Sequence, residues 1–235
     1  MRKILFIFLI LLTGIVNAQQ QKLNTALKKE LDEIMKSDQG YRIFFESGTT
    51  PEKKEELVKE LNIDKERLAK EGWGLVAAQD SINLQKIEKI ISQYGYPGKS
   101  MVGEPANQSA WYVIQHSEKI EKYLPVIQRA AKNKEIPFQL AATMEDRYLM
   151  QTGREQIYGS QGSGEFWEEN GKEYETEYIW PIKDPEHVNK RRKKAGFSTT
   201  VEENARRIYG ESFVYKVYTL DDVKNRRIEV KEAGH

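Results

Sequence analysis

The chain has 235 residues, 39% of them hydrophobic and 10% aromatic, and this is enough apolar material to bury a core, which excludes a wholly disordered protein. The first 18 residues contain two basic residues, Arg2 and Lys3, and no acidic one. The rest of the chain therefore has 35 basic and 36 acidic residues and is nearly neutral. A nucleic-acid partner is not expected, because such binding depends on clustered positive charge. The absence of cysteine excludes disulfides, a thiolate nucleophile and the lipid-bearing cysteine of a lipoprotein.

Residues 1–18 have the organisation of a secretory signal peptide. The basic pair Arg2 and Lys3 precedes an apolar run over residues 4–12, and Val16-Asn17-Ala18 offers a small-residue cleavage site. A membrane anchor is the alternative, but the run is shorter than the ~18–20 residues that span a bilayer. We therefore expect cleavage after Ala18, export to the periplasm or the extracellular space, and no membrane span in the cleaved chain.

Helical periodicity dominates residues 23–151. Apolar residues recur on one face over residues 23–41, and Thr49 or Thr50 before Pro51 predicts the start of a charged helical pair over residues 52–70. Further helices are predicted around residues 82–91, over residues 106–134 with a kink or break at Pro125, and over residues 137–151. No sustained strand pattern occurs in this part of the sequence.

From Gly153 the pattern changes to that of a small antiparallel sheet. Asn170-Gly171 separates two short segments and is a strong hairpin signal, because both turn positions favour positive φ. Residues 156–161 are then a candidate first strand and residues 162–164 the turn that follows, which gives a three-stranded meander near residues 156–180. These glycines match neither the GxxxxGK[ST] phosphate loop nor the GxGxxG dinucleotide fingerprint.

The remaining elements complete the expected organisation. Asp184-Pro185 predicts a helix that ends at Gly196, with the cations at 191–194 solvated near its C-terminus. Residues 213–220 are β-prone, although a helix stays open, and residues 224–235 are polar enough to fray. We expect a mostly α fold, a helical bundle or array with the small sheet, arranged as a signal peptide at 1–18, one domain at 19–211 and a C-terminal extension at 212–235.

Charged and polar residues interrupt the apolar faces of three helices. Asp146 and Arg147 have mainly apolar neighbours three and four positions away, and Asp38 follows the apolar face of the first helix with Arg42 one turn further on. If residues 111–124 form one helix, His116 lies on its buried row. Because an unpaired buried charge costs several kcal/mol, these side chains should meet partners on other elements. They form either a shared site or satisfied groups within the core.

The same residues carry a resemblance to a family. The chain resembles an uncharacterised bacterial domain of unknown function with Asp-Gln-x-x-Arg, a central histidine, Asp-Arg and Gln-x-Tyr-Gly-Thr-Gln motifs. The matching positions are Asp38-Gln39-Gly40-Tyr41-Arg42, Asn83, residues 94–97, Gly103, His116, Asp146-Arg147, residues 153–161, Pro181, Asp184, Arg191-Arg192 and Gly196. Ser160 stands where the family has threonine, and the charged segment at 52–71 is longer than in the family. The resemblance implies a mostly helical fold and one shared polar site, without an activity.

Two functions remain open at this stage. The favoured one is a ligand-binding or interaction module whose partner is a small molecule, a glycan or an envelope protein. The alternative is a cell-envelope hydrolase or lyase in which His116 and Asp146 are the acid and base and Arg147 binds negative charge. Contact between His116 and Asp146 in an open cleft would favour the enzyme. The candidate ligand-binding residues are Asp38, Gln39, Arg42, Gln156, Tyr158 and Gln161. No cofactor or metal is expected, because the three histidines show no metal-binding spacing.

Overall fold

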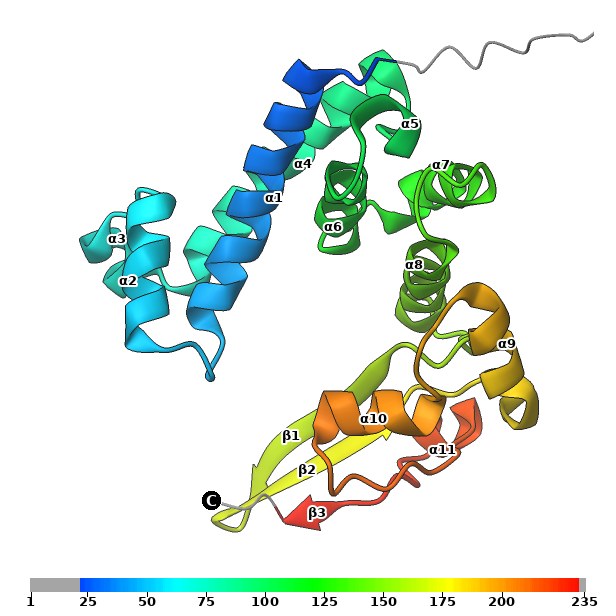
Figure 1. The fold of residues 1–235 in the computed structure, drawn as a ribbon. Helices are drawn as coiled ribbons and strands as arrows, with labels where there is room; N and C mark the ends of the chain where they lie inside the picture. Colours follow the sequence, from blue (N-terminus) through cyan, green and yellow to red (C-terminus); the bar gives the residue numbers. More distant parts are fainter. Residues whose placement is uncertain (1–21, 233–235) are drawn as a thin grey trace, which may run out of the picture.

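The computed structural model describes residues 22–232. Within this range the protein is mostly helical, with eleven α-helices and a small three-stranded antiparallel sheet, so the predicted fold class is confirmed (Figure 1). The helices of residues 25–151 gather in one part, and the sheet lies in the other with the last helices (Figure 1). Over the same residues, no helix combines the length and apolar character needed to cross a membrane. The predicted signal peptide, residues 1–18, lies outside the described residues.

The elements follow one another in two groups. The first group is α1 (Thr25–Phe45), α2 (Pro51–Glu60), α3 (Lys65–Glu71), α4 (Trp73–Tyr94), α5 (Lys99–Val102), α6 (Ser109–Gln115), α7 (Ile120–Lys132) and α8 (Phe138–Gln151), with a 3-10 turn at Ala106–Gln108. The second group is β1 (Gly162–Glu169), β2 (Lys172–Ile179), α9 (Val188–Ala195), α10 (Val201–Tyr209), α11 (Leu220–Lys224) and β3 (Lys231–Glu232), with a 3-10 turn at Pro185–His187.

Local signals place the first helices where the sequence predicts them. The Asn24 side chain accepts a hydrogen bond from Leu27 N and caps α1, and Thr50 caps α2 with Pro51 in its first turn. The apolar face of α1 packs against α4 and α6, where Leu31, Ile87 and Ile114 are fully buried. Burial of one such side chain contributes about 1.5–3 kcal/mol, and this core holds together the three helices around the candidate site.

The helix predicted over residues 106–134 is interrupted, but not at Pro125 as predicted. Pro125 lies inside α7, and the chain leaves helical geometry instead between α6 and α7, at residues 116–119. Pro125 is in the second turn, where its missing N–H removes a single hydrogen bond. At the actual break, Ser117 N and Oγ both donate to Ile114 O, at 3.0 and 2.8 Å. His116 therefore ends α6 and does not lie on the surface of a continuous helix.

The hairpin prediction is correct, but its third strand is not. Asn170 and Gly171 have φ of 54° and 73°, and they join β1 to β2 in the register Glu169↔Lys172 through Gly162↔Ile179. Residues 156–161 form no strand and contribute one isolated bridge, Gln156↔Ile182. Residues 162–164, predicted as a turn, belong to β1. The third strand is β3, which pairs with β2 from the far end of the chain.

The predicted C-terminal extension packs on the sheet in its described part. Phe213 joins a second apolar cluster with Ile179 and Ile182 from the sheet region and Val201 from α10. Residues 213–219 form no strand, in contrast to their β-prone sequence, and α11 follows them. The segment at 224–232, expected to fray, ends in β3 and buries Ile228. Phe213 thus contributes to the second core, and β3 completes the sheet.

Candidate functional site

An open hollow of about 490 Å³ lies between α1, α8 and the linker that follows α6. We call it the arginine cavity, because Arg42 of α1 and Arg147 of α8 both line it. The full lining is Arg42, Gln115, His116, Ser117, Glu118, Arg147 and Gln151. A second hollow of about 370 Å³ shares His116, Ser117 and Glu118 and extends towards Asp80. The helix break at 116–119 therefore places His116 between two hollows.

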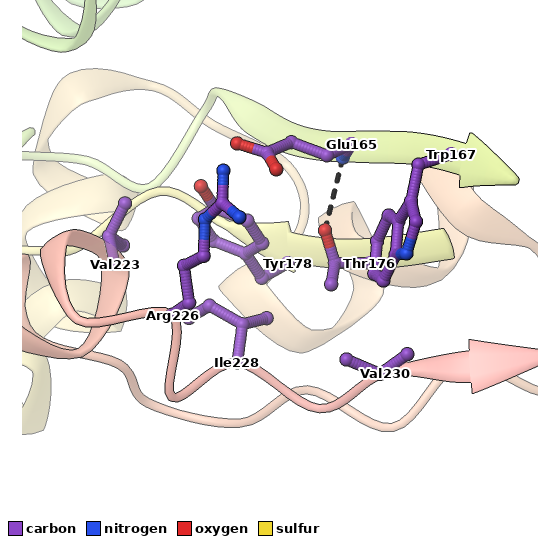
Figure 2. Close-up of a pocket in the computed structure, with 8 residues that line it drawn as sticks. All are labelled: Glu165, Trp167, Thr176, Tyr178, Val223, Arg226, Ile228 and Val230. Atoms are coloured by element: carbon purple, nitrogen blue, oxygen red, sulfur yellow. Dashed lines mark hydrogen bonds between the residues drawn. The ribbon is translucent and has the colours of Figure 1, made fainter. Parts of the chain in front are cut away.

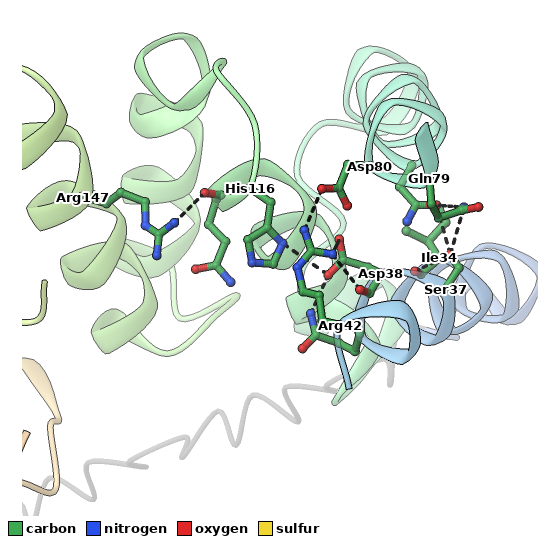
Figure 3. A network of polar contacts seen from close by, with 11 residues as sticks. Ile34, Ser37, Asp38, Arg42, Gln79, Asp80, His116 and Arg147 are labelled. Carbon is green, nitrogen blue, oxygen red and sulfur yellow. Dashed lines mark hydrogen bonds and ion pairs between the residues drawn. The ribbon is translucent and has the colours of Figure 1, made fainter. Parts of the chain in front are cut away.

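His116 faces a buried carboxylate from α1 (Figure 3). Its Nδ1 is 3.5 Å from Oδ2 of Asp38, whose side chain has no exposed surface, whereas 20% of the His116 side chain is exposed. Arg42 Nη1 donates to Asp38 O at 2.8 Å and lies 3.6 Å from Asp38 Oδ1, and Arg42 Nη2 donates to Asp80 Oδ2 at 2.7 Å. Gln39 Nε2 donates to Asp38 Oδ2 at 2.5 Å. The structure thus joins four predicted site residues, Asp38, Gln39, Arg42 and His116, in one network.

Buried polar atoms without a hydrogen-bond partner concentrate around this network. They are Asp38 Oδ1, Asp80 Oδ1, Asn83 Nδ2, His116 Nδ1 and Arg147 Nε. In the described part of the chain, the other such side-chain atoms are one each on Asn107 and Ser109. Buried polar groups are paired in the great majority of cases, and departures from this rule gather at functional sites. These unpaired atoms make the network the candidate site of the described chain.

Arg147 enters the arginine cavity without an acidic partner. Its Nη1 donates to Gln115 O at 3.2 Å, its Nε has no partner, and no carboxylate within residues 22–232 forms an ion pair with it (Figure 3). Burial lowers the pKa of Arg147, because the charged guanidinium loses hydration. The unused edge, Nε with Nη2, is the edge with which Arg67 binds both carboxylate oxygens of Glu71, at 2.9 and 3.0 Å.

Asp146 does not meet His116. It is fully buried, and its carboxylate accepts hydrogen bonds from three backbone amides beyond α8: Ile157 N at 2.7 Å, Tyr158 N at 3.0 Å and Ser160 N at 2.9 Å. Burial raises the pKa of Asp146, and the three amides partly offset this effect. The contact between Asp146 and His116 that would have favoured the enzyme is therefore absent, and His116 faces Asp38 instead. Adjacent positions on a helix point in different directions, so Arg147 reaches the cavity while Asp146 holds the loop at 157–160.

Residues 156–161, the amide-rich segment predicted to bind ligand, are engaged in hydrogen bonds within the protein. Gln156 is fully buried, and its Nε2 donates to Gln161 O at 2.9 Å and Trp180 O at 2.7 Å, while its Oε1 accepts from Gln161 N at 2.9 Å. The Tyr158 ring stacks on Phe197, with centroids 5.9 Å apart, and burial raises the Tyr158 pKa. None of Gln156, Tyr158 and Gln161 lines the arginine cavity. The structure therefore separates these three from His116 and Arg147.

Two arginines expected to be solvated bind this same segment. Arg192 is 1% exposed and donates from Nη1 to Tyr158 O at 2.8 Å and from Nε to Thr199 O at 2.8 Å. Arg191 donates from Nε to Ile157 O at 3.0 Å. The prediction of solvated cations is wrong for both, because their guanidinium groups donate to backbone carbonyls of the folded chain. The order of Asp184, the arginines and Gly196 in the family motif was the signal that could have identified them.

Carboxylates and imidazole do not assemble into a metal centre in the part of the chain that the structure describes: no group of three or more His, Cys, Asp or Glu side chains is placed to hold an ion. His116 and Asp38 contribute one ligand type each, and their neighbour Arg42 is a cation. The cavity is thus lined by two guanidinium groups, Arg42 and Arg147, beside the imidazole of His116.

The sequence matches the family of unknown function DUF6624 over residues 62–218, which is more than half of the chain. The match includes His116, Arg147 and the clamped loop at 157–160, and it begins after Asp38 and Arg42 of α1. No curated protein and no solved structure matches the chain. The resemblance seen in the sequence motifs is confirmed, and the chain belongs to DUF6624, a family of unknown function.

Proposed function

We propose that the protein is an exported ligand-binding module that takes an oxyanion, a carboxylate or a phosphate, in the arginine cavity. The observation that carries the proposal is Arg147, a partly buried guanidinium that lines the hollow, makes a single side-chain hydrogen bond and has no carboxylate partner among the described residues. A charged group removed from water needs a partner, and a planar guanidinium edge matches two oxygens of one anion. A small molecule or a glycan that carries such a group is the ligand class.

The rest of the cavity supports an anion. Arg42 lies on the same wall and is held by Asp38 and Asp80, so its position is fixed before a ligand arrives. His116 adds a ring nitrogen, Nε2, that has no partner among the described residues. Glu118, the acidic residue of the lining, lies in the linker after α6, and its side chain is exposed to solvent. Export rests on the signal-peptide pattern of residues 1–18.

Calorimetric titration with inorganic phosphate, acetate and citrate, at constant ionic strength, tests the proposal. We expect saturable binding of at least one of these anions, weakened about tenfold or more by Arg147→Gln, because a charge-assisted bidentate pair contributes more than the ~1.4 kcal/mol that a factor of ten requires. Glu145→Gln is the matched control, since Glu145 neighbours Arg147 on α8 and does not line the cavity. Equal affinity in wild type and Arg147→Gln contradicts the proposal.

A hydrolase is the second candidate, and the orientation of His116 favours it. Nδ1 faces the buried Asp38 carboxylate and leaves Nε2 for the cavity, which is the arrangement in which a carboxylate orients an imidazole for proton transfer. An enzyme of this kind would release phosphate from a phosphate monoester bound at Arg147. His116→Asn should then abolish phosphate release and preserve anion binding. If wild type binds the ester and releases no phosphate, the binding module is the correct function.

A further inference from the structure

A separate hollow lies on the sheet, far along the chain from the arginine cavity. One face of the hairpin carries Glu165 and Trp167 of β1 and Thr176 and Tyr178 of β2, since alternate residues share a face. The chain after α11 crosses this face and leaves a hollow of about 340 Å³, which is within the range of about 300–1,000 Å³ of small-molecule sites. Its lining is Glu165, Trp167, Thr176, Tyr178, Val223, Arg226, Ile228 and Val230 (Figure 2).

The hollow has a charged end and an apolar end. Figure 2 shows the Glu165 carboxylate and the Arg226 guanidinium together at one end, beside Tyr178 and Ile228, with Trp167 and Val230 at the other end. No hydrogen bond or ion pair joins Glu165 to Arg226, and neither side chain forms an ion pair elsewhere in residues 22–232. The neighbouring Arg227 is different, because it binds both Asp221 and Asp222.

Arg226 follows α11 at the position where a helix commonly ends in the left-handed conformation. Its φ is 52°, in the left-handed region that non-glycine residues seldom adopt, and its N–H donates to Val223 O at 3.2 Å. Arg227 N also donates to Asp222 O at 2.8 Å, and these two bonds cap the C-terminus of α11. The helix end thus fixes the backbone from which the Arg226 side chain extends to the hollow.

We infer that this hollow binds a free α-amino acid with a large apolar side chain. The ligand carboxylate would pair with Arg226 and its ammonium with Glu165, so that both unpaired charges of the protein are neutralised by one zwitterion. The side chain would lie between Trp167 and Tyr178 on one side and Ile228 and Val230 on the other, where an aromatic ring gains both burial and ring contacts. This inference is independent of the arginine cavity.

Titration calorimetry with L-phenylalanine on the full-length chain is the test, with 3-phenylpropionate and phenethylamine as probes that lack the ammonium and the carboxylate. We expect L-phenylalanine to bind at least tenfold more tightly than either probe. Glu165→Gln and Arg226→Asn should each lower its affinity at least tenfold. Asparagine is chosen because it tolerates the left-handed backbone, so the variant keeps its fold.

Glu168→Gln is the matched control for Glu165→Gln, since Glu168 lies on the opposite face of β1 and is exposed. It should leave the affinity unchanged, and circular dichroism melting should show all variants folded. Absence of L-phenylalanine binding, equal binding of the three probes, equal affinity in Glu165→Gln and Glu168→Gln, or preferential binding of a neutral sugar would each overturn the inference. Loss of anion binding in Arg147→Gln bears only on the arginine cavity, so the two proposals fail separately.

Discussion

Asp146→Asn should destabilise the fold much more than substitutions at the residues on either side of it. The buried carboxylate accepts hydrogen bonds on both oxygens, from Ile157 N and Tyr158 N on Oδ1 and from Ser160 N on Oδ2. Asparagine keeps a single acceptor oxygen. Its NH₂ group must then face an amide N–H of the loop, so at least one buried donor loses its partner.

The cost follows from the number and kind of bonds lost. A hydrogen bond to a charged group contributes about 1.5–3 kcal/mol, and the remaining bonds also lose their charge assistance. Asparagine is neutral, so the substitution also removes the cost of burying a charged carboxylate, the same cost that raises the Asp146 pKa. This gain offsets part of the loss. We therefore expect Asp146→Asn to lower the free energy of unfolding by about 2–4 kcal/mol, a large share of the ~5–15 kcal/mol typical of a domain.

Urea unfolding followed by circular dichroism measures this difference. Glu145→Gln is the matched acid-to-amide control. Burial raises the pKa of Glu145, so loss of its charge should change stability by less than about 0.5 kcal/mol. Arg147→Gln should also remain close to wild type, because it loses one 3.2 Å hydrogen bond. If Asp146→Asn unfolds at the same urea concentration as Glu145→Gln, the loop clamp does not stabilise the fold and the reasoning is wrong.

Three further predictions concern separate parts of the molecule. Hydrogen bonds from Lys119, Lys122 and Tyr123 lower the pKa of Glu88 to about 2. Its stabilising contribution is therefore present above pH 4.5 and is lost as the pH falls towards 2. Carboxyl NMR titration of Glu88 should give a midpoint near this pKa, and a midpoint near 4.5 would show that the cluster does not form. Gly164→Ala should lower the melting temperature by several degrees, because a Cβ would lie 2.1 Å from Thr176 O, and an unchanged melting curve would contradict the β1–β2 approach. Tyr209→Phe should cost about 0.5–1.5 kcal/mol in urea unfolding, because the hydroxyl donates to Ser163 O and Tyr178 O in a site that raises its pKa to about 12, and wild-type stability in this variant would argue against those bonds.

Elements determined by neighbouring residues could be predicted from the sequence, whereas those that depend on distant partners could not. The Thr50-Pro51 cap and the Asn170-Gly171 turn depend on φ preferences and on hydrogen bonds a few residues away, so short motifs suffice. The third strand could not be identified in this way, because β3 pairs with β2 across more than fifty residues and is only two residues long. Residues 156–161 were predicted as a strand, but the Gln156 side chain takes the bonds that a neighbouring strand would need.

The candidate site was likewise predictable only in the part that depends on neighbouring residues. Its inward-facing residues could be found because Asp38, His116 and Arg147 interrupt apolar faces, and the contact of Asp38 with Arg42 follows from their i, i+4 spacing. The partners across elements could not be found. His116 meets Asp38 because α6 ends at residue 115, and this end depends on the turn at Ser117 and on packing against α1. Asp146 is likewise directed to a loop whose path is fixed by Arg192 from α9.

The most direct test of the arginine cavity is the NMR resonance of the Arg147 Nε–H group during titration with phosphate at constant ionic strength. We predict a saturable downfield shift of this proton as the unpaired Nε gains an oxyanion acceptor, while the Nε–H resonance of Arg67, already bonded to Glu71, stays in place. A shift that is absent, or that never saturates and equals the shift of Arg67, would contradict the claim that Arg147 is the centre of an anion-binding site.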